Sequence, residues 1–254
     1  MQSFSRVVAA VAALSVSVVA PNAARAQALP PAATIIAKYV NAIGGKAEIM
    51  KVTSYKQSAT MDIPAVGLSA TMEIYAAAPN KMSSKMSLPG MGEVEQGFNG
   101  TVGWQVNPMQ GPRVLADKEL AIAKDGSDFY ANMLYSADRY STMETVGDTT
   151  INGEKAYKVK LVSKATGNES ASFFSQTSGL LMGGVTTTES PMGSVTSTQI
   201  VSDYKKFGGV MMPTKMVTTV GPQQLVLTIK DVTLNGVPDS AFDIPAQIKP
   251  LIKP

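Results

Sequence analysis

A two-residue alternation of larger and more polar side chains constrains the first half of this chain most strongly. Over residues 55–63, tyrosine, alanine, methionine and isoleucine recur at every second or fourth position between lysine, serine, threonine and aspartate. After a Pro-Ala-Val-Gly segment, the pattern resumes over residues 68–75. Successive side chains of a β-strand point to opposite faces of a sheet, so this period predicts strands rather than helices. The two runs, joined by a short turn, predict a β-hairpin.

A second hairpin signal surrounds the only tryptophan, Trp104. It follows the pair Asn99-Gly100, which accepts positive φ at both central positions of a tight turn and so predicts paired strands on either side. Val102, Trp104 and Val106 then alternate with slim or polar residues. The bulky face of this strand needs an apolar surface to lie against, and the pattern leaves open whether that surface is a packed core or a bound lipid.

Helical patterns occur in two places. Apolar residues recur at helical spacing over residues 35–43, and Gly44-Gly45 ends that helix. Residues 114–140 predict one or two further helices, broken near Asp125-Gly126. Strand and turn signals occupy the rest of the chain, and we expect the tail at residues 242–245 to close a sheet edge.

This order of elements predicts a mainly β protein. We count about ten antiparallel strands linked by short turns, which favours a single strongly curved antiparallel sheet or half-open β-barrel with an N-terminal helix and a central helical lid segment. No low-complexity linker divides residues 27–254, so we expect one domain there.

The first 26 residues are typical of a secretory signal peptide. Arg6 supplies positive charge, residues 7–20 are small and apolar apart from serines, and Ala24-Arg25-Ala26 gives a small-x-small cleavage site. We therefore expect cleavage near Ala26 and a periplasmic or secreted mature protein. No later segment approaches the roughly 20 consecutive apolar residues of a spanning helix, so no integral membrane segment is expected in the mature chain.

Composition excludes several classes of function. Without Arg6 and Arg25, the 22 basic residues fall to 20, against 19 acidic ones, and no basic stripe is present, so nucleic acid is not an expected partner. The chain has no cysteine and no histidine, which excludes disulfides, Ser-His triads and the usual zinc sites. We expect no cofactor and no metal.

Carboxylates alone could still hydrolyse glycosides, and two nominal pairs exist, Glu93 with Glu95 and Glu73 with Asp62. Glu93 and Glu95 alternate on a predicted strand, however, as residues on a solvated face also do. This favours a protein that is not an enzyme.

Methionine is unusually frequent, with 15 residues in the chain. Met82 with Met86, or Met211 with Met212 and Met216, are conceivable copper(I) ligands, but their spacing equally suits ordinary core positions. A third interpretation is that flexible thioethers line a surface that accommodates variable apolar ligands.

The order of these segments resembles that of the LolA/LolB-like family of periplasmic lipoprotein carriers. The resemblance is carried by an aromatic-Asn-Gly segment, a tryptophan, an Asn-Pro pair, a Tyr…Gly-Gly-Val…Pro stretch and a closing Phe-Asp-Ile-Pro: Phe98-Asn99-Gly100, Trp104, Asn107-Pro108, Tyr204, Gly208-Gly209-Val210, Pro213 and residues 242–245. It implies a half-open β-barrel whose concave, helix-covered face holds the acyl chains of lipoproteins or lipids.

The function hypothesis that follows is an exported, non-catalytic carrier for apolar ligands. We expect bulky residues on strand faces to line its cavity: Met61, Met72, Met86, Phe98, Trp104, Met216 and Val226. Residues 114–140 would form the lid, with Asp125-Gly126 as a hinge. The alternative is a structural envelope-assembly module with a filled core that contacts protein partners. The roles of Arg113 and Arg139 stay unassigned.

Overall fold

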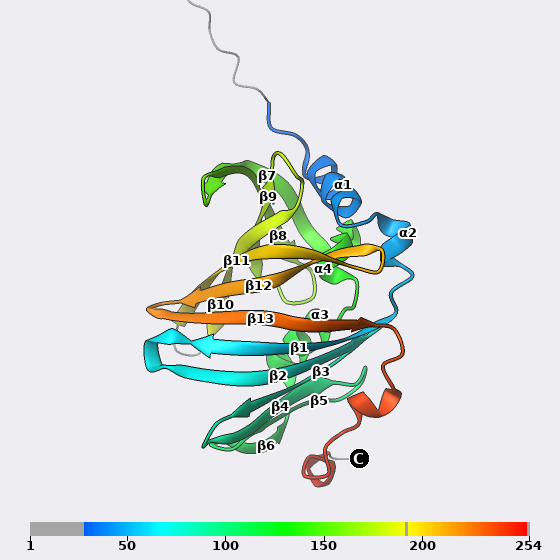
Figure 1. Cartoon of the computed structure of the whole chain (residues 1–254), viewed down its shortest axis with the longest axis vertical. Helices are drawn as coiled ribbons and strands as arrows, with labels where there is room; N and C mark the ends of the chain where they lie inside the picture. Colours follow the sequence, from blue (N-terminus) through cyan, green and yellow to red (C-terminus); the bar gives the residue numbers. More distant parts are fainter. Residues whose placement is uncertain (1–27, 191–192, 253–254) are drawn as a thin grey trace, which may run out of the picture.

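The computed structural model describes residues 28–190 and 193–252 as a strongly curved antiparallel sheet flanked by short helices (Figure 1). The predicted signal peptide, residues 1–26, lies outside the described residues. The helices are α1 (Ala32–Ala42), α2 (Lys46–Ile49), α3 (Asp117–Gly126) and α4 (Ala131–Leu134), with 3-10 turns η1 (Pro64–Val66), η2 (Ala137–Arg139), η3 (Asp239–Phe242) and η4 (Lys249–Leu251). The strands are β1 (Ser54–Ile63), β2 (Leu68–Ala77), β3 (Lys81–Leu88), β4 (Gly92–Phe98), β5 (Gly103–Asn107), β6 (Gly111–Val114), β7 (Tyr140–Ile151), β8 (Glu154–Ser163), β9 (Glu169–Ser175), β10 (Leu181–Ser190), β11 (Gly193–Phe207), β12 (Val210–Val220) and β13 (Gln223–Leu234).

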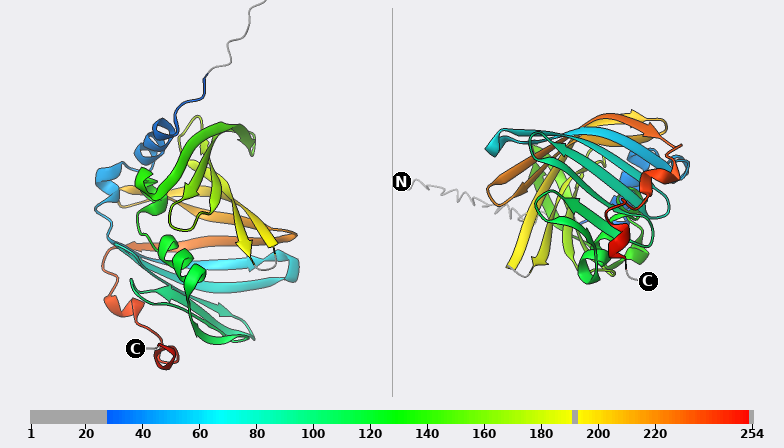
Figure 2. Two further views of the ribbon diagram at one scale, coloured as in Figure 1. Left: turned by 180° about the vertical axis from the view of Figure 1, so that it is seen from behind. Right: turned by 90° about the horizontal axis from the view of Figure 1, so that it is seen from below.

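All 13 described strands belong to one sheet, in the order β6-β5-β4-β3-β2-β1-β13-β12-β11-β10-β9-β8-β7. The sheet curls without closing, which leaves β6 and β7 as its edges (Figure 2). This confirms the predicted mainly β, half-open architecture with an N-terminal helix and a central helical segment. The strand count exceeds the expected ten partly because β7 is a polar edge strand whose Thr and Glu residues give a weak apolar signal.

Helix α1 buries the apolar stripe that its spacing predicts, including Ile35, Ile36 and Tyr39. The helix ends at Ala42, just before Gly44-Gly45, which confirms the predicted stop. Gly44 has a φ of 125°, and a side chain there would run into the backbone of Gly209. Glycine therefore allows the chain to leave α1 while touching the β11–β12 turn, where the Met211 amide donates to the Ile43 carbonyl.

The Asn-Gly pairs form two different kinds of turn. Asn152 and Gly153, between the paired strands β7 and β8, have φ of 49° and 84°, as a two-residue hairpin turn requires. Asn99 instead uses its side chain: its Oδ1 accepts hydrogen bonds from the Thr101 and Val102 amides at 3.0 and 2.8 Å. The predicted hairpin forms, with Phe98 opposite Gly103, but through an Asx-type turn.

Helices α3 and α4, here called the lid helices, lie across the concave side of the sheet (Figure 2). The predicted break is confirmed, since α3 ends at Gly126. Helix α3 packs closely on β5 at Gly103, where an added Cβ would lie 3.1–3.3 Å from side-chain atoms of Leu115 and Leu120.

The C-terminal tail does not close a sheet edge, so that expectation is wrong. The edges are β6 and β7, whereas η3 contacts β3. The Ser83 hydroxyl donates to the Ala241 carbonyl at 2.7 Å, and Lys81 pairs with Asp239 at 3.0 Å. Burial of Phe242, which is 3% exposed and whose ring centroid lies 5.8 Å from the Lys81 ammonium, explains why the tail docks on the sheet instead of adding a strand.

The largest hydrophobic core lies where α1 and α4 pack on the sheet. Phe174 of β9 is fully buried there, with ring centroids 5.3 Å from Tyr39 and 5.5 Å from Tyr135. Ile43, Ile49 and Val159 complete the same cluster. Within the described part of the chain, no helix has the length and apolar character needed to cross a membrane.

The strand register sorts side chains onto two faces. We call the face toward the lid helices the inner face and the opposite one the outer face. Directly paired residues share a face, which places Met61, Leu227 and Met216 in one inner row and Ala59, Met72 and Met86 in the next: Met61 pairs with Leu227 and Leu227 with Met216, while Ala59 pairs with Met72 and Met72 with Met86.

Candidate functional site

A cavity of about 480 Å³ lies between the inner face and the helices, and we call it the main chamber. Residues from α1, from the segment of the lid helices and from strands β1–β3 and β7–β12 contribute to its walls. Its volume falls within the roughly 300–1,000 Å³ typical of small-molecule pockets. The interior is therefore hollow beneath the helices.

Five methionines line the main chamber: Met82, Met133, Met211, Met212 and Met216. They come from β3, α4 and β12, which are far apart in the sequence. Unbranched thioether side chains adapt their shape at low cost, so these walls suit an apolar guest of variable outline.

Buried tyrosines form another wall of the main chamber. Burial raises the pKa of Tyr135 to about 12, although a hydrogen bond with Ser172 partly offsets the effect. Burial, with a smaller contribution from Tyr135 and Tyr204, also raises the pKa of Tyr39. The Tyr39 hydroxyl donates to the Asn132 carbonyl at 3.0 Å and that of Tyr204 to the Leu181 carbonyl at 2.9 Å. These rings are thus neutral and hydrogen-bonded at physiological pH.

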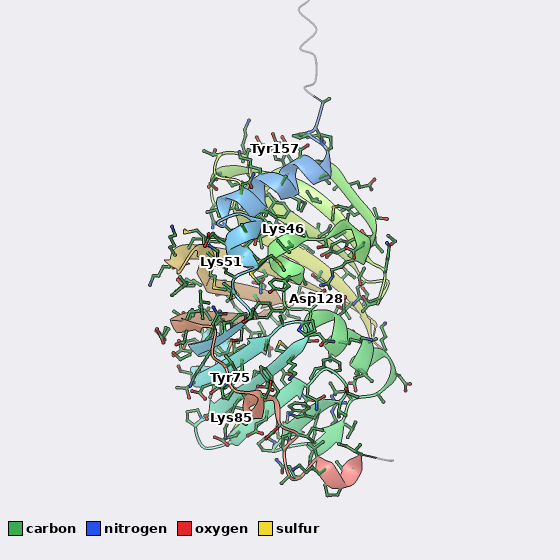
Figure 3. All side chains as sticks on the ribbon, turned by 90° about the vertical axis from the view of Figure 1, so that its right-hand side faces the viewer. Lys46, Lys51, Tyr75, Lys85, Asp128 and Tyr157 are labelled. Atoms are coloured by element: carbon green, nitrogen blue, oxygen red, sulfur yellow. The ribbon has the colours of Figure 1, made fainter. Side chains whose placement is uncertain are left out.

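One ion-pair cluster holds the junction between the lid helices. Arg139 Nη2 lies 2.6 Å from Asp125 Oδ1, and its Nη1 lies 2.5 Å from Asp128 Oδ2. The Arg139 side chain is only 16% exposed. Figure 3 shows Asp128 at this junction. Because Asp128 also lines the main chamber, Arg139 both neutralises the chamber's carboxylate and ties down the predicted hinge.

A second chamber of about 380 Å³ lies between α3 and strands β3–β6. Phe98, Leu115 and Ile122 line its apolar part, while Gln96, Gln105, Arg113 and Glu119 line its polar part. Met82 and Gly126 line both chambers, so the two cavities are neighbours that share these residues as a wall beside the end of α3.

The outer face carries a more polar hollow of about 380 Å³ beneath the C-terminal tail. Tyr75 and Lys85, labelled in Figure 3, line it together with Glu73, Glu95 and residues of the tail. Trp104 also contributes to its wall and is only 2% exposed. Its indole lies over Gly97, where any side chain would clash with the ring.

The sequence matches no known family profile and no curated protein. Solved structures share its architecture. A LolA superfamily protein from Nitrosomonas europaea is 14% identical with a TM-score of 0.57, and the match covers 85% of this chain and 99% of the other. A DUF1329 family protein from Desulfovibrio piger is 12% identical with a TM-score of 0.60, and the match covers 86% of this chain and 100% of the other. A domain described as an outer membrane lipoprotein-sorting protein, from Vibrio parahaemolyticus, is 10% identical with a TM-score of 0.53. That match covers 82% of this chain and 97% of the other.

The chain has a LolA-like fold. The resemblance to the LolA/LolB-like family, inferred from the order of segments, is confirmed for the fold.

Within the LolA-like sheet, the seven predicted cavity residues divide between the faces. Met61, Met72, Met86, Phe98 and Met216 lie on the inner face, since each pairs with another inner-face residue. Trp104 pairs with Gly97, and Val226 pairs with Asp62, which places both on the outer face. Met216 lines the main chamber, and Phe98 and Trp104 line the second. Contact of these seven residues with a ligand stays a prediction.

Sequence reasoning missed the residues that the helices contribute to the main chamber. Tyr39 from α1 and Met133 and Tyr135 from the α4 region line the main chamber. Bulky strand residues were chosen as the cavity lining instead, because alternation shows directly which residues of a strand share a face. The helical spacing of residues 35–43 could have identified Tyr39, since it puts that ring on the buried stripe of α1.

The four carboxylates of the nominal pairs lie on the outer face, where Glu73, Glu93 and Glu95 are in ion pairs and Asp62 accepts a hydrogen bond from the Ser69 hydroxyl at 2.6 Å. Lys85 Nζ lies 2.6 Å from Glu93 and 3.3 Å from Glu95, and Lys56 lies 2.8 Å from Glu73. A hydrogen bond from Lys56 lowers the pKa of Glu73, and one from Lys85 lowers that of Glu93. A catalytic acid needs a raised pKa, whereas the pKa values of Glu73 and Glu93 are lowered. Among the described residues, no group of three or more histidine, cysteine or acidic side chains is placed to hold a metal.

Proposed function

We propose that residues 27–254, exported after cleavage near Ala26, form one domain that carries or binds the acyl chains of lipoproteins or lipids without reacting with them. The observation that carries this proposal is the main chamber: about 480 Å³, under the lid helices, with five methionines and a neutral tyrosine wall. The fold shared with a LolA superfamily protein and a lipoprotein-sorting domain supports the same function.

Desolvation would drive binding. Each methylene that leaves water for an apolar wall contributes about 0.8 kcal/mol, so ten methylenes contribute on the order of 8 kcal/mol before ordering costs are subtracted. Two polar groups of the chamber, the Tyr39 and Tyr204 hydroxyls, already donate to backbone carbonyls. These two groups therefore need no partner on the guest, which suits a hydrocarbon chain.

The proposal is tested by titrating an environment-sensitive apolar dye into delipidated protein. We expect saturable binding and displacement of the dye by a fatty acid. Native mass spectrometry of protein purified from its own host identifies a retained ligand directly. Absence of saturable dye binding, together with a protein mass free of any ligand, would overturn the carrier function.

A second function, a structural module that contacts envelope proteins, is favoured by a different observation. Three successive turns at one end of the sheet, β1–β2, β3–β4 and β5–β6, each expose a large apolar side chain: Val66, Met91 and Met109 at 69, 49 and 87%. Exposed apolar residues gathered at one end are typical of contact surfaces. Dye binding also separates the two functions, because the module needs no ligand.

A further inference from the structure

The second chamber differs from the main chamber in having a cationic side chain in its wall. Its polar wall is a row of cross-strand neighbours on the inner face: Gln96 of β4 pairs with Gln105 of β5, which pairs with Arg113 of β6. Among the residues that line either chamber, Arg113 is the sole lysine or arginine. The two neighbouring cavities therefore have one cationic side chain in their lining, at the polar end of the second chamber.

Arg113 has hydrogen-bonding capacity to spare. Its Nε and Nη2 donate to the same acceptor, Gln105 Oε1, at 2.9 and 2.5 Å, and its Nη1 donates to Glu119 Oε2 at 2.6 Å. Three of the five guanidinium N–H groups are thus used by described residues, which leaves one on each terminal nitrogen. Those two N–H groups can donate hydrogen bonds to a further anion.

The partner of Arg113 is easily exchanged. Glu119 is on the first turn of α3, its side chain is 55% exposed, and that of Arg113 is 40% exposed. Ion pairs this exposed contribute little net stability, so a ligand anion can compete with Glu119 for the guanidinium. Gln105 meanwhile orients the guanidinium, because its Oε1 accepts hydrogen bonds from both Nε and Nη2 of Arg113.

Apolar side chains of the second chamber lie between Arg113 and the main chamber. Phe98, Leu115 and Ile122 line the second chamber beyond its polar end. Met82 lines both chambers and lies between them, and its flexible side chain can yield to a guest. A head group at Arg113 would therefore direct its hydrocarbon chain past Met82.

We propose that Arg113, supported by Gln105, forms a head-group subsite that binds the carboxylate or phosphate of a single-chain amphiphile, whose chain runs past Met82 into the main chamber. The inference rests on the proposed carrier function and adds an anionic ligand class to it. Charge-assisted hydrogen bonds to a guanidinium are about twice as strong as neutral ones, which gives the subsite its selectivity.

The test compares three ligands with the same chain, dodecanoic acid, dodecyl phosphate and dodecanol, by displacement of a bound apolar dye at about pH 8, where both anions are ionised. We expect the wild-type protein to bind both anions at least about tenfold more tightly than the alcohol. Arg113→Gln should remove this preference while leaving dodecanol affinity within about twofold. Acetate and inorganic phosphate, which lack a chain, should not displace the dye.

Glu119→Gln is the matched control, because it breaks the same ion pair but keeps the cation. We expect it to retain or increase the preference for anions, and equal thermal stability of the two variants would show that lid docking is not the cause. Equal affinity of the wild-type protein for acid and alcohol, or an equal loss for all three ligands in Arg113→Gln, would overturn the subsite. Displacement by acetate or phosphate alone would do the same. Failure of every amphiphile to bind would instead overturn the carrier function.

Discussion

The inner and outer faces of one sheet show opposite ways of using the same strands. On the outer face of β2–β4, Lys85 bridges Glu93 and Glu95 in solvent. The neighbouring positions of the same strands face inward, and there Met72 of β2 pairs with Met86 of β3, both half-buried. The comparison shows that strand periodicity separates a solvated, charged surface from an adaptable apolar one without any change of scaffold.

The inner face is itself divided by what covers it. Where α1 and α4 pack on β8 and β9, Phe174 and Val159 are fully buried. Where the sheet runs on through β12, β13 and β1, Met216, Leu227 and Met61 are only half-buried. The first region makes the fold stable, and the second is the part that we expect to accommodate a guest.

The largest expected effect is the loss of Phe174 from the packed region. Phe174→Ala removes a fully buried ring between Tyr39 and Tyr135 and should lower the free energy of unfolding by about 3–5 kcal/mol. Urea unfolding followed by far-UV circular dichroism measures it. Phe207→Ala, at a half-buried position near the end of β11, is the control and should cost less than half as much. Equal losses would show that the two regions do not differ in packing.

A second effect concerns alkaline pH. Burial raises the pKa of Tyr135 from 10.0 to about 12, so the folded protein keeps a proton that the unfolded chain loses. Stability from this group is complete below about pH 10 and is lost as the pH rises toward 12, by up to about 3 kcal/mol. Tyr135→Phe should flatten that part of the stability curve. An unchanged slope between about pH 10 and 12 would contradict the assignment.

A smaller effect separates the ion pairs of the two faces. Arg139→Gln removes both contacts at the lid junction, where the arginine is 16% exposed, and should lower the free energy of unfolding by about 1–2 kcal/mol. Lys85→Gln removes two contacts on the solvated outer face and should leave stability nearly unchanged. Thermal unfolding at low and high salt measures both. A larger loss in the lysine variant would reverse the comparison.

The sequence predicted the fold well because its signals are local. Alternation over residues 55–63 and 68–75 identified the β1–β2 hairpin, and the helical stripe of residues 35–43 identified α1. The polar edge strand β7 lacked such a signal. The docking of Phe242 on the sheet is a long-range contact, which no local pattern specifies.

The candidate site was less accessible to sequence reasoning, because alternation tells which residues of one strand share a face but not which face looks inward. Met61 and Val226 both occupy bulky positions, yet the register places them on opposite faces. The β4–β5 pairing likewise turns Trp104 away from the inner face that Phe98 occupies. Only the pairing of neighbouring strands resolves this, and it depends on the whole sheet.

The central claim is that ligands bind inside the main chamber, and two neighbouring residues of β12 test it most directly. Thr218 lines the chamber, whereas Thr219 is exposed on the other face. Tryptophan at either position adds the same bulk to the same strand. Titration of an apolar dye against both variants should show that Thr218→Trp weakens binding at least about tenfold and that Thr219→Trp leaves it within about twofold of wild type. Equal binding by the two variants would contradict the claim, because the guest would then lie somewhere other than the inner face.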